Sequence, residues 1–281
     1  MSIVFEKVNY SYLADSDLAF QALTDVSLTI GEGEFIGIIG HTGSGKSTLM
    51  QHMNGLLLPT SGSVTVDGFL TSDKTQLRQA RSRVGMVFQY PEYQLFEETV
   101  IKDVMFGPKN LGLDEATCKQ RAKDAMAQVG LDPERFSELS PFELSGGEKR
   151  RAAIAGIIAI QPKYLALDEP MAGLDPRGRK EIMELLEKFR TELGCTIIMI
   201  SHSMDDMARY AQRIAVLDHG SLVMLGTPGE IFSQEEKLSE MGLSVPQSAR
   251  LTHLLIRSGL DLPRDIVTME SLADELLKEG N

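Results

Sequence analysis

The chain has 281 residues, with 28 basic and 40 acidic side chains, a formal net charge of −12 and a pI near 5.0. This acidic balance argues against a nucleic-acid-binding protein, which normally shows a basic domain. The two cysteines, Cys118 and Cys195, are far apart and lack metal-type spacing, so neither a zinc site nor a disulfide framework is indicated, and a reducing compartment fits.

The apolar and charged stretches of the sequence further narrow the class of protein. The N-terminal segment Met1–Glu6 has no basic region followed by an apolar one, and the longest apolar run, Ala152–Ile160, is too short to cross a bilayer. We therefore expect any work at a membrane to be done from the water side. Two basic clusters, one at Arg78, Arg81 and Arg83 and one at Lys149–Arg151, are predicted to lie on solvated helix faces.

The first part of the chain is predicted to be rich in strands. Short runs of alternating or continuously apolar residues indicate strands, and glycine-containing turns separate them. These strands are predicted at Ile3–Val8, Val26–Ile30, Phe35–Ile39 and Ser63–Val66. Gly31-Glu32-Gly33 turns the chain into the third of them, and Asp67-Gly68 follows the fourth.

A glycine-rich segment joins the buried strand Phe35–Ile39 to a predicted helix, Lys46–Met53. Its glycines permit the backbone angles at which successive N–H groups turn toward an anion, and the helix start adds unpaired N–H groups. Lys46 is expected to reach the outer phosphates of a nucleoside triphosphate, and the Ser47 hydroxyl to bind Mg²⁺. We call this segment the phosphate loop; it consists of Gly40, His41, Thr42, Gly43, Ser44, Gly45, Lys46, Ser47 and Thr48.

From Glu98 to Ile160 the pattern becomes helical, which predicts a helical insertion. Asp114 is expected to cap a helix that ends at Gly130. The apolar face of that helix is formed by Ala122, Ala125, Met126 and Val129.

The second half returns to alternating strands and helices, which implies a parallel sheet with helices on both faces. Strands are predicted at Lys163–Leu167 and Thr196–Ile200, with the helix Pro176–Leu193 between them. After Gly226 the pattern stays helical, with segments at Gln247–Arg257 and Met269–Lys278. Because a tail of this length is unfavourable for a separate core, we expect it to dock on the main domain, on a partner or on a second copy.

Two carboxylates, Asp168 and Glu169, end the strand near residue 167. Adjacent acids are by themselves typical of a solvated loop, but the phosphate loop changes their meaning. Asp168 is predicted to hold the magnesium ion, directly or through its water, and Glu169 to polarise the attacking water as general base.

A second glycine-containing segment, Leu144-Ser145-Gly146-Gly147-Glu148, precedes an apolar helix. Ser145 and Glu148 have the spacing of a capping box, which is a sufficient structural explanation. Two glycines also leave backbone N–H groups open to an anion, so Ser145, Gly146 and Gly147, here called the glycine corner, are expected to receive a γ-phosphate. Because the helical insertion carries this corner outward, we infer that the phosphate belongs to a partner subunit and that two nucleotides lie at a dimer interface.

The motifs together resemble those of ATP-binding cassette (ABC) ATPases, the motor subunits of ABC transporters, over residues 1 to about 225. The resemblance identifies the phosphate loop as the Walker A motif, Leu144–Glu148 as the signature and Tyr164–Asp168 as Walker B with catalytic Glu169. It also assigns a Q-loop at Gln89, a D-loop at Ala172–Asp175 and a switch histidine at His202. Two departures are Met171 in place of Thr or Ser and Glu148 in place of Gln; neither removes a phosphate or metal ligand.

The resemblance implies further roles. The Gln89 amide is expected to touch the metal or the attacking water, His202 to hold the γ-phosphate or the water, and Asp175 to act across the dimer interface. Tyr12 is either the aromatic residue that stacks on adenine or a core tyrosine.

A narrower resemblance connects the chain to the energy-coupling factor (ECF) transporter ATPases, which energise vitamin and metal-ion importers. It rests on Phe88–Phe96 with the helix that follows, on Ile154–Gly156, and on Gly173–Arg179, the last of which is similar to the second of two unlike ATPases in heterodimeric members. Leu95, Phe96, Met105 and Phe106 either line a groove for helices of a membrane partner or belong to the core.

These resemblances imply an α/β P-loop NTPase with a parallel core sheet, an N-terminal antiparallel β subdomain, a helical insertion at about 90–160 and a cassette ending near residue 225. Residues 226–281 are expected to form a helical dimerisation region.

The implied function is MgATP hydrolysis on the cytoplasmic face of the membrane, with a homologous ATPase as partner in a heterodimer or homodimer. An integral-membrane coupling subunit and a substrate-binding membrane subunit complete the expected assembly. No nucleic-acid partner is expected. The alternatives are another cobalt- or nickel-type or general ABC importer, and a soluble ABC ATPase.

Overall fold

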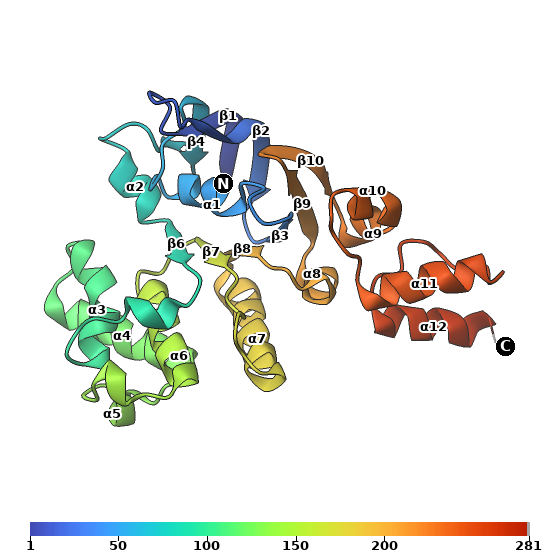
Figure 1. Ribbon diagram of the computed structural model, residues 1–281. Coiled ribbons are helices and arrows are strands. Elements are labelled where there is room, and N and C mark those ends of the chain that lie inside the picture. The colour runs from blue at the N-terminus through green and yellow to red at the C-terminus, as the bar shows by residue number, and fades with distance from the viewer. Residues whose placement is uncertain (280–281) are drawn as a thin grey trace.

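Two sheets form the centre of the molecule (Figure 1). The strands are β1 (Ser2–Tyr12), β2 (Phe20–Gly31), β3 (Phe35–Ile39), β4 (Ser61–Val66), β5 (Phe69–Leu70), β6 (Val84–Val87), β7 (Tyr164–Asp168), β8 (Thr196–Ile200), β9 (Arg213–Asp218) and β10 (Ser221–Gly226). The computed structural model describes residues 1–279. Over this range the first sheet has the order β2-β1-β4-β5 and the second the order β10-β9-β3-β8-β7-β6.

Helices surround the sheets and form the tail. The α-helices are α1 (Lys46–Met53), α2 (Leu77–Arg81), α3 (Val100–Asn110), α4 (Glu115–Gln128), α5 (Pro133–Phe136), α6 (Gly146–Ile158), α7 (Pro176–Leu193), α8 (Met204–Tyr210), α9 (Pro228–Phe232), α10 (Glu235–Glu240), α11 (Gln247–Arg257) and α12 (Met269–Glu279). Of two 3₁₀ turns, η1 (Pro91–Gln94) precedes α3 and η2 (Pro141–Glu143) lies between α5 and α6.

The six-stranded sheet determines where the functional segments meet. β3 pairs in parallel with β8 and β9, and β7 pairs in parallel with β6 and β8, while β10 runs antiparallel to β9. The carboxyl ends of the parallel strands therefore share one edge, where ligands bind in open α/β sheets. The predicted α/β class, with a parallel core sheet and an antiparallel N-terminal sheet, is confirmed.

Residues along β3 explain why its run is continuously apolar. Phe35 and Ile39 belong to the apolar cluster that includes α7 and the helical lobe, whereas Ile36 and Ile38 belong to the cluster under the antiparallel sheet and α1. Side chains alternate between the two faces of a strand, so a strand covered on both faces needs apolar residues at every position. Each of these four side chains is fully buried.

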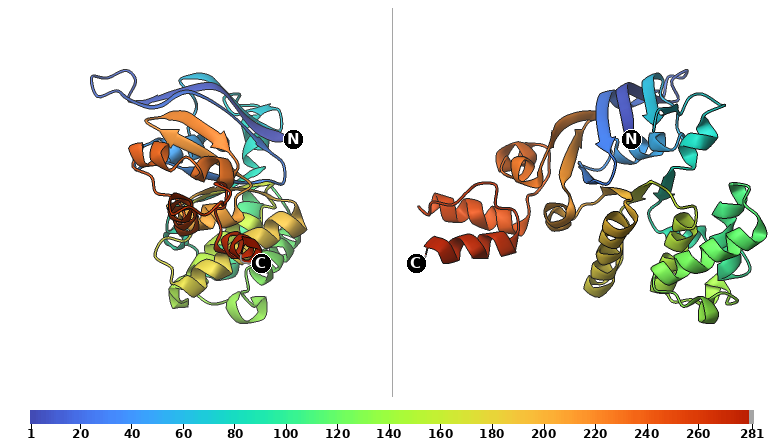
Figure 2. Two further views of the ribbon diagram at one scale, coloured as in Figure 1. Left: turned by 90° about the vertical axis from the view of Figure 1, so that its right-hand side faces the viewer. Right: turned by 180° about the vertical axis from the view of Figure 1, so that it is seen from behind.

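Most predicted elements of the cassette are confirmed, but β1 and β2 are longer than the alternation indicated. The helices α1, α7 and α11 have the predicted bounds, and α12 extends one residue beyond its predicted end. The β1–β2 ladder contains register shifts between Phe5 and Ser11, which break the two-residue period there. The β1–β2 hairpin projects from the sheet (Figure 2, left).

Helices α3 to α6 form a lobe beside the sheets, at the opposite end of the molecule from the tail (Figures 1 and 2). Asp114 caps α4 as predicted, because its carboxylate accepts the Thr117 N–H at 2.9 Å. The predicted apolar face is also confirmed, since Ala122, Ala125 and Met126 are buried in the large cluster.

The C-terminal tail differs from the expectation that it would lack a core of its own. Leu262, Ile266 and Leu272 form a small buried cluster separate from the two main ones, with side chains of α11 and α12 around it. The tail also docks on the main core, one of the predicted alternatives, through Ile231 and Phe232 of α9 and Ala249 of α11. Residues 280 and 281, part of the predicted C-terminal region, lie outside the described residues. Within residues 1–279, no helix is both long and apolar enough to traverse a bilayer.

Candidate functional site

The phosphate loop follows β3 and leads into α1, as the sequence predicted. A side chain at Gly40 would clash with the Leu217 carbonyl and the Ser44 side chain, so this position requires glycine. Gly45 caps α1 in the left-handed conformation, at φ 99°. The loop is therefore held close to β9 on one side while its N–H groups precede a helix start.

The Lys46 side chain lies inside the loop. It is 7% exposed, and its ammonium donates hydrogen bonds to the carbonyl oxygens of Gly40 at 2.7 Å and His41 at 2.8 Å. Burial lowers the pKa of Lys46 below its usual value, while the nearby carboxylates of Glu169 and Asp168 oppose that shift. The loop thus surrounds a cation that can be paired with an anion.

Two observations indicate that the loop suits phosphate. The Ser44 side chain is fully buried, and its hydroxyl has no hydrogen-bond partner within the described chain. At Gly43, φ is 83° and the space where a side chain would stand is open. A bound oxyanion would accept a hydrogen bond from this hydroxyl and would fit the open space beside the glycine at the helix N-terminus.

The end of β7 brings the two carboxylates to the same edge of the sheet. Burial raises the pKa of Asp168 above its usual value, and a hydrogen bond from Ser47 opposes the shift. Ser47 itself lies exposed at the first turn of α1. A hydroxyl oxygen and a carboxylate oxygen are the kind of ligand atoms that Mg²⁺ prefers.

Glu169 directly follows β7 in the left-handed conformation, with φ 49°. Its Oε1 lies 2.9 Å from Nε2 of His202, a residue that follows β8. The structure thus brings together Lys46, Ser47, Asp168, Glu169 and His202 from three separate segments. The carboxylate can accept a proton from water, and the imidazole holds its orientation.

Gln89 and Tyr12 lie at the periphery of this group. Gln89 follows the edge strand β6, which pairs with β7, and its side chain is exposed. Tyr12 ends β1; it is 37% exposed, and its hydroxyl lies 3.1 Å from Oγ1 of Thr48. The half-exposed ring is not a core tyrosine, and whether it stacks on adenine stays a prediction.

The glycine corner is part of the helical lobe. Ser145 and Glu148 form the predicted capping box of α6, with the Glu148 carboxylate 2.8 Å from the Ser145 N–H. Gly146 has open space where a side chain would stand. The corner begins α6 in the helical lobe, whereas the phosphate loop leads into α1 beside the sheets (Figure 1). Gly147 instead borders a cavity lined by the start of α7.

Asp175 caps α7, because its carboxylate accepts the Gly178 N–H at 2.7 Å. The residue is exposed at the end of the segment 172–175. Its predicted action across a dimer interface remains a prediction.

The structure contradicts the prediction made from the sequence for Arg150. It was expected on a solvated helix face but is 3% exposed. Its guanidinium donates to both carboxylate oxygens of Glu92, at 3.1 and 2.9 Å, and to the carbonyls of Pro170 and Ala172, at 3.2 and 2.9 Å. One side chain therefore ties α6 to η1, which follows Gln89, and to the segment after Glu169. The sequence offered no signal for this, because each partner is 20 or more residues away from Arg150 in the chain.

The predicted membrane-partner groove is partly present. A cavity between α2, α3 and α6 is lined by Leu95, Phe96 and Phe106, and by the basic residues Arg78 and Arg81. Phe96 and Phe106 are 61% and 44% exposed and contact each other edge to face, with ring centroids 5.0 Å apart. Met105 does not line it, because that side chain is buried in the core.

Comparisons with known proteins agree with this geometry. Residues 23–172 match the family model described as ABC transporter. The "Energy-coupling factor transporter ATP-binding protein EcfA2" of Clostridioides difficile (strain 630) is 52% identical, covering 99% of this chain and 97% of that protein. The protein of the same name from Symbiobacterium thermophilum is 54% identical, covering 96% and 93%.

Two solved structures are similar in fold. One is titled "Structure of cbiO1 from clostridium perfringens: Part of the ABC transporter complex cbiONQ"; it has a TM-score of 0.74 and 37% identity, covering 90% of this chain and 98% of that chain. The other is a dimeric post-hydrolysis state of the ATP-binding cassette MJ0796 bound to ADP and Pi, with a TM-score of 0.71 and 31% identity, covering 80% and 98%.

Proposed function

Because the chain belongs to the ABC ATPase family, and within it to the ATP-binding subunits of energy-coupling factor transporters, we propose that it pairs with a homologous cassette over two ATP molecules and hydrolyses them with Glu169 as base. The chain binds ATP and is the ATPase of an ECF-type importer. The residue roles, the bound metal and the partners below are our proposal.

One observation carries the assignment of the base. Glu169 is fixed by its left-handed backbone and by the 2.9 Å contact with His202, beside the buried cation of Lys46. A carboxylate in this position accepts a proton from the attacking water. The Lys46 ammonium stabilises the negative charge that develops on the transferred phosphoryl group.

Ser47 and Asp168 are proposed to hold Mg²⁺, with Gln89 as a further ligand or as a contact to the water. When bound, the ion neutralises charge on the outer phosphates. The hydrogen bond that joins Ser47 to Asp168 supports this pairing, because it shows that the two oxygens converge.

The second cassette is needed because the glycine corner lies away from the phosphate loop of its own chain. We propose that Ser145, Gly146 and Gly147 bind the γ-phosphate held by the neighbouring subunit, with Asp175 at the same interface. The dimeric form described for the cassette MJ0796 supports such pairing. Residues 226–281 are proposed to add dimer contacts, supported by the exposed Leu251 and Leu254 on α11. Whether the partner is an identical or an unlike ATPase is left to experiment.

The groove beside Phe96 and Phe106 is the proposed site for a helix of the integral-membrane coupling subunit, and a separate membrane subunit is proposed to bind the substrate. Exposed aromatic rings flanked by Arg78 and Arg81 support an amphipathic helical partner with acidic groups. Such docking would hold the ATPase peripherally on the cytoplasmic face of the membrane.

Replacement of the base tests the chemistry. Glu169→Gln is expected to slow ATP turnover in the assembled transporter by roughly 10²- to 10⁴-fold, because the amide cannot accept the proton. ATP binding should be retained, since Lys46 and the phosphate loop are unchanged. Turnover is measured by phosphate release and binding by a fluorescent nucleotide.

Glu98→Gln is the matched control, because it removes an acid in an exposed ion pair with Lys102 at the start of the helical lobe. It should hydrolyse ATP at the wild-type rate. If Glu169→Gln also turns over at that rate, another group is the base.

Docking is tested separately with Phe96→Ser. Because Phe96 is mostly exposed, the variant should fold and bind ATP like the wild type, but it should no longer co-purify with membrane subunits from detergent extracts. Exposed Phe142, near the glycine corner, offers the control Phe142→Ser. Equal recovery of membrane subunits with both variants would place the docking surface elsewhere.

A further inference from the structure

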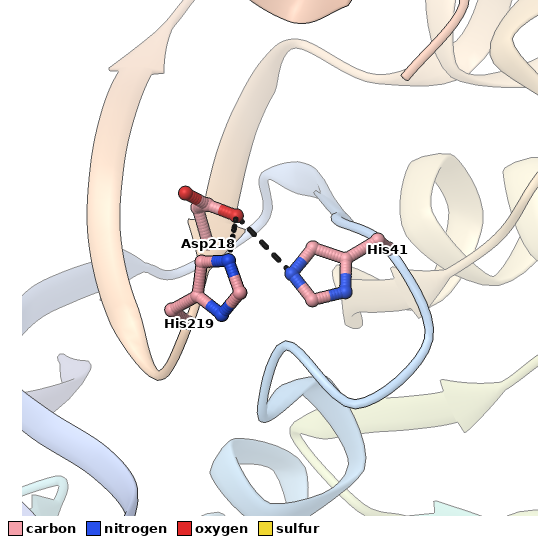
Figure 3. Close-up of side chains that lie close together, drawn as sticks. All are labelled: His41, Asp218 and His219. Carbon is pink, nitrogen blue, oxygen red and sulfur yellow. Dashed lines mark ion pairs between the residues drawn. The ribbon is translucent and has the colours of Figure 1, made fainter. Parts of the chain in front are cut away.

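Three side chains that the proposed function does not use as a group meet beside the phosphate loop (Figure 3). His41 is the second residue of the loop, Asp218 is the last residue of β9, and His219 lies in the turn that leads to β10. Because β9 is the direct neighbour of β3 in the sheet, the residues that follow these two strands lie side by side. A separation of 177 residues in sequence concealed the group from sequence reasoning.

The distances suit a shared cation. Asp218 Oδ1 lies 3.1 Å from His41 Nε2 and 3.9 Å from His219 Nε2, and the three ligand atoms all lie within 4.8 Å of one another. In a tetrahedral site with metal–ligand bonds of about 2.0–2.1 Å, ligand atoms are about 3.3 Å apart. His219 is 85% exposed, so its side chain is free to close the remaining gap.

The contacts of the His41 ring are the strongest indication of a ligand. Its Nδ1 lies 2.7 Å from the Thr42 carbonyl oxygen, an acceptor that fixes the proton on Nδ1. In the neutral ring Nε2 then carries a bare lone pair, yet it faces the Asp218 carboxylate. This Nε2 has no solvent contact and no hydrogen-bond partner among the described residues, since the 3.1 Å approach lacks hydrogen-bond geometry. A cation bound between Nε2 and the Asp218 carboxylate would satisfy both atoms, and the experiment below separates this from an ion pair of the two side chains alone.

We propose that His41, Asp218 and His219 bind a divalent transition-metal cation of the Zn²⁺, Co²⁺ or Ni²⁺ class, separate from the magnesium of the ATP site. Two imidazole nitrogens and one carboxylate favour these metals over Mg²⁺ and Ca²⁺, which prefer oxygen ligands. The hydrogen bond from His41 Nδ1 to a backbone carbonyl is the outer contact that metal-bound histidines normally make. Three protein ligands leave further coordination positions to water.

The cation would join the phosphate loop to the β9–β10 turn. His41 belongs to the loop that encloses Lys46, whereas Asp218 and His219 belong to the β9–β10 hairpin, whose turn already donates one hydrogen bond to the loop, from the Gly220 N–H to the Ser44 carbonyl oxygen at 3.1 Å. A bound cation therefore restrains the loop through one of its own side chains. Any effect of the cation on nucleotide affinity must be matched by an equal effect of nucleotide on cation affinity.

The test is a Co²⁺ titration of the tag-free, chelator-treated full chain without nucleotide, because triphosphates themselves bind metals. We expect one equivalent of Co²⁺ to bind, with the visible absorption of a site containing nitrogen ligands, and Zn²⁺ to displace it. Zn²⁺ should also raise the melting temperature of the wild-type chain, since it binds only the folded protein.

Two variants and one control decide the outcome. His219→Ala and Asp218→Asn should each weaken Co²⁺ binding by at least about 100-fold, since loss of even an outer contact costs 10- to 100-fold. His253→Gln is the control: His253 lies 2.8 Å from Glu235 in the tail, a pair that resembles His41 and Asp218 but has no third ligand within residues 1–279. The proposal is overturned if the wild type binds no stoichiometric Co²⁺, or if His219→Ala binds it as tightly as the wild type, which would leave only a protonated His41–Asp218 pair.

Discussion

The phosphate loop and the glycine corner are both helix N-termini suited to an anion, but they are built differently. The phosphate loop is surrounded: Lys46 is buried, Gly40 packs against β9, and the end of β7 lies beside it. The glycine corner is open, with a capping box as its internal support and unfilled space at Gly146. In our proposal, one half of the ATP site is therefore complete within the chain, and the other is an open surface that meets a partner.

This difference indicates which steps of our proposal need one chain and which need two. The loop half has the cation, the carboxylates and the histidine, so it accounts for binding. At the corner half, the capping box receives the N–H groups of Ser145 and Glu148, which leaves those of Gly146 and Gly147 without an acceptor among residues 1–279. In our proposal hydrolysis depends on a second subunit, whereas ATP binding does not.

The largest expected effect comes from placing a charge at the corner. Gly146→Glu should fold normally, because the position is open and a carboxylate in the first turn of a helix is favourable. It should lower ATP turnover by about 100-fold or more, since like charges brought together at an interface cost several kcal/mol. ATP binding by the single chain should be unchanged.

Gly146→Gln separates charge from size. The neutral side chain has nearly the same volume, so a defect confined to Gly146→Glu identifies an anion at the corner. Both variants are compared by phosphate release in the assembled transporter and by nucleotide binding to the free chain. Normal turnover by Gly146→Glu would contradict the two halves meeting across an interface.

An intermediate effect is expected at Arg150, the contact that connects the two halves within one chain. Arg150→Met leaves Glu92 without its partner and two carbonyls without a donor, so it should destabilise the fold by about 2–4 kcal/mol. Glu92→Gln should cost less, because Glu92 is 18% exposed and the amide still accepts a hydrogen bond.

Urea unfolding of the two single variants and the double variant measures the coupling. We expect the double variant to be less destabilised than the sum of the singles. Strict additivity would mean that Arg150 acts through the Pro170 and Ala172 carbonyls rather than through Glu92. Arg151→Met serves as the control, since that neighbour makes only a 3.6 Å ion pair with Glu181.

The smallest expected effect lies at Asp103, which supports the groove rather than either half of the ATP site. Its buried carboxylate accepts the N–H groups of Phe96 and Glu97, the latter at 2.9 Å. Asp103→Ala should cost about 1–2 kcal/mol through two unsatisfied donors. Asp103→Asn, which keeps an acceptor, should cost less.

The pH dependence of the Asp103 contribution has a defined sign. Burial raises the pKa of the Asp103 carboxyl above its usual value, with the two backbone N–H groups opposing the shift. The folded state therefore holds the proton to a higher pH than the unfolded state, and the free energy of unfolding falls as pH rises through that window. Asp103→Asn should lack this component in urea unfolding measured from acidic to neutral pH. An identical pH profile for both proteins would show that another group is responsible.

Local chemistry explains what the sequence could predict. The buried strand β3, the Asp114 cap and the capping box at Ser145 depend on residues within a few positions of one another, and each was confirmed. The phosphate loop, 40–48, followed from the same kind of pattern, because a strand, a glycine loop and a helix are consecutive, whereas His202 was assigned through the family resemblance.

What the sequence could not predict depends on which strands are neighbours. Arg150 was misplaced on the surface because its partners come from η1 and from the segment after β7. The approach of His41 to Asp218 and His219 depends on β9 lying beside β3, which periodicity does not encode. The small cluster of the tail was missed because two of its three buried residues, Leu262 and Ile266, lie in the segment between α11 and α12, outside any helical period.

The backbone of Glu169 limits how this position can vary during evolution. A residue with φ near 49° is costly for β-branched side chains, whereas glycine, asparagine and aspartate tolerate it best. Lineages that abandon hydrolysis should therefore drift toward Gln, Asn, Asp or Gly here, and should avoid Val, Ile and Thr even after the selection for catalysis has gone.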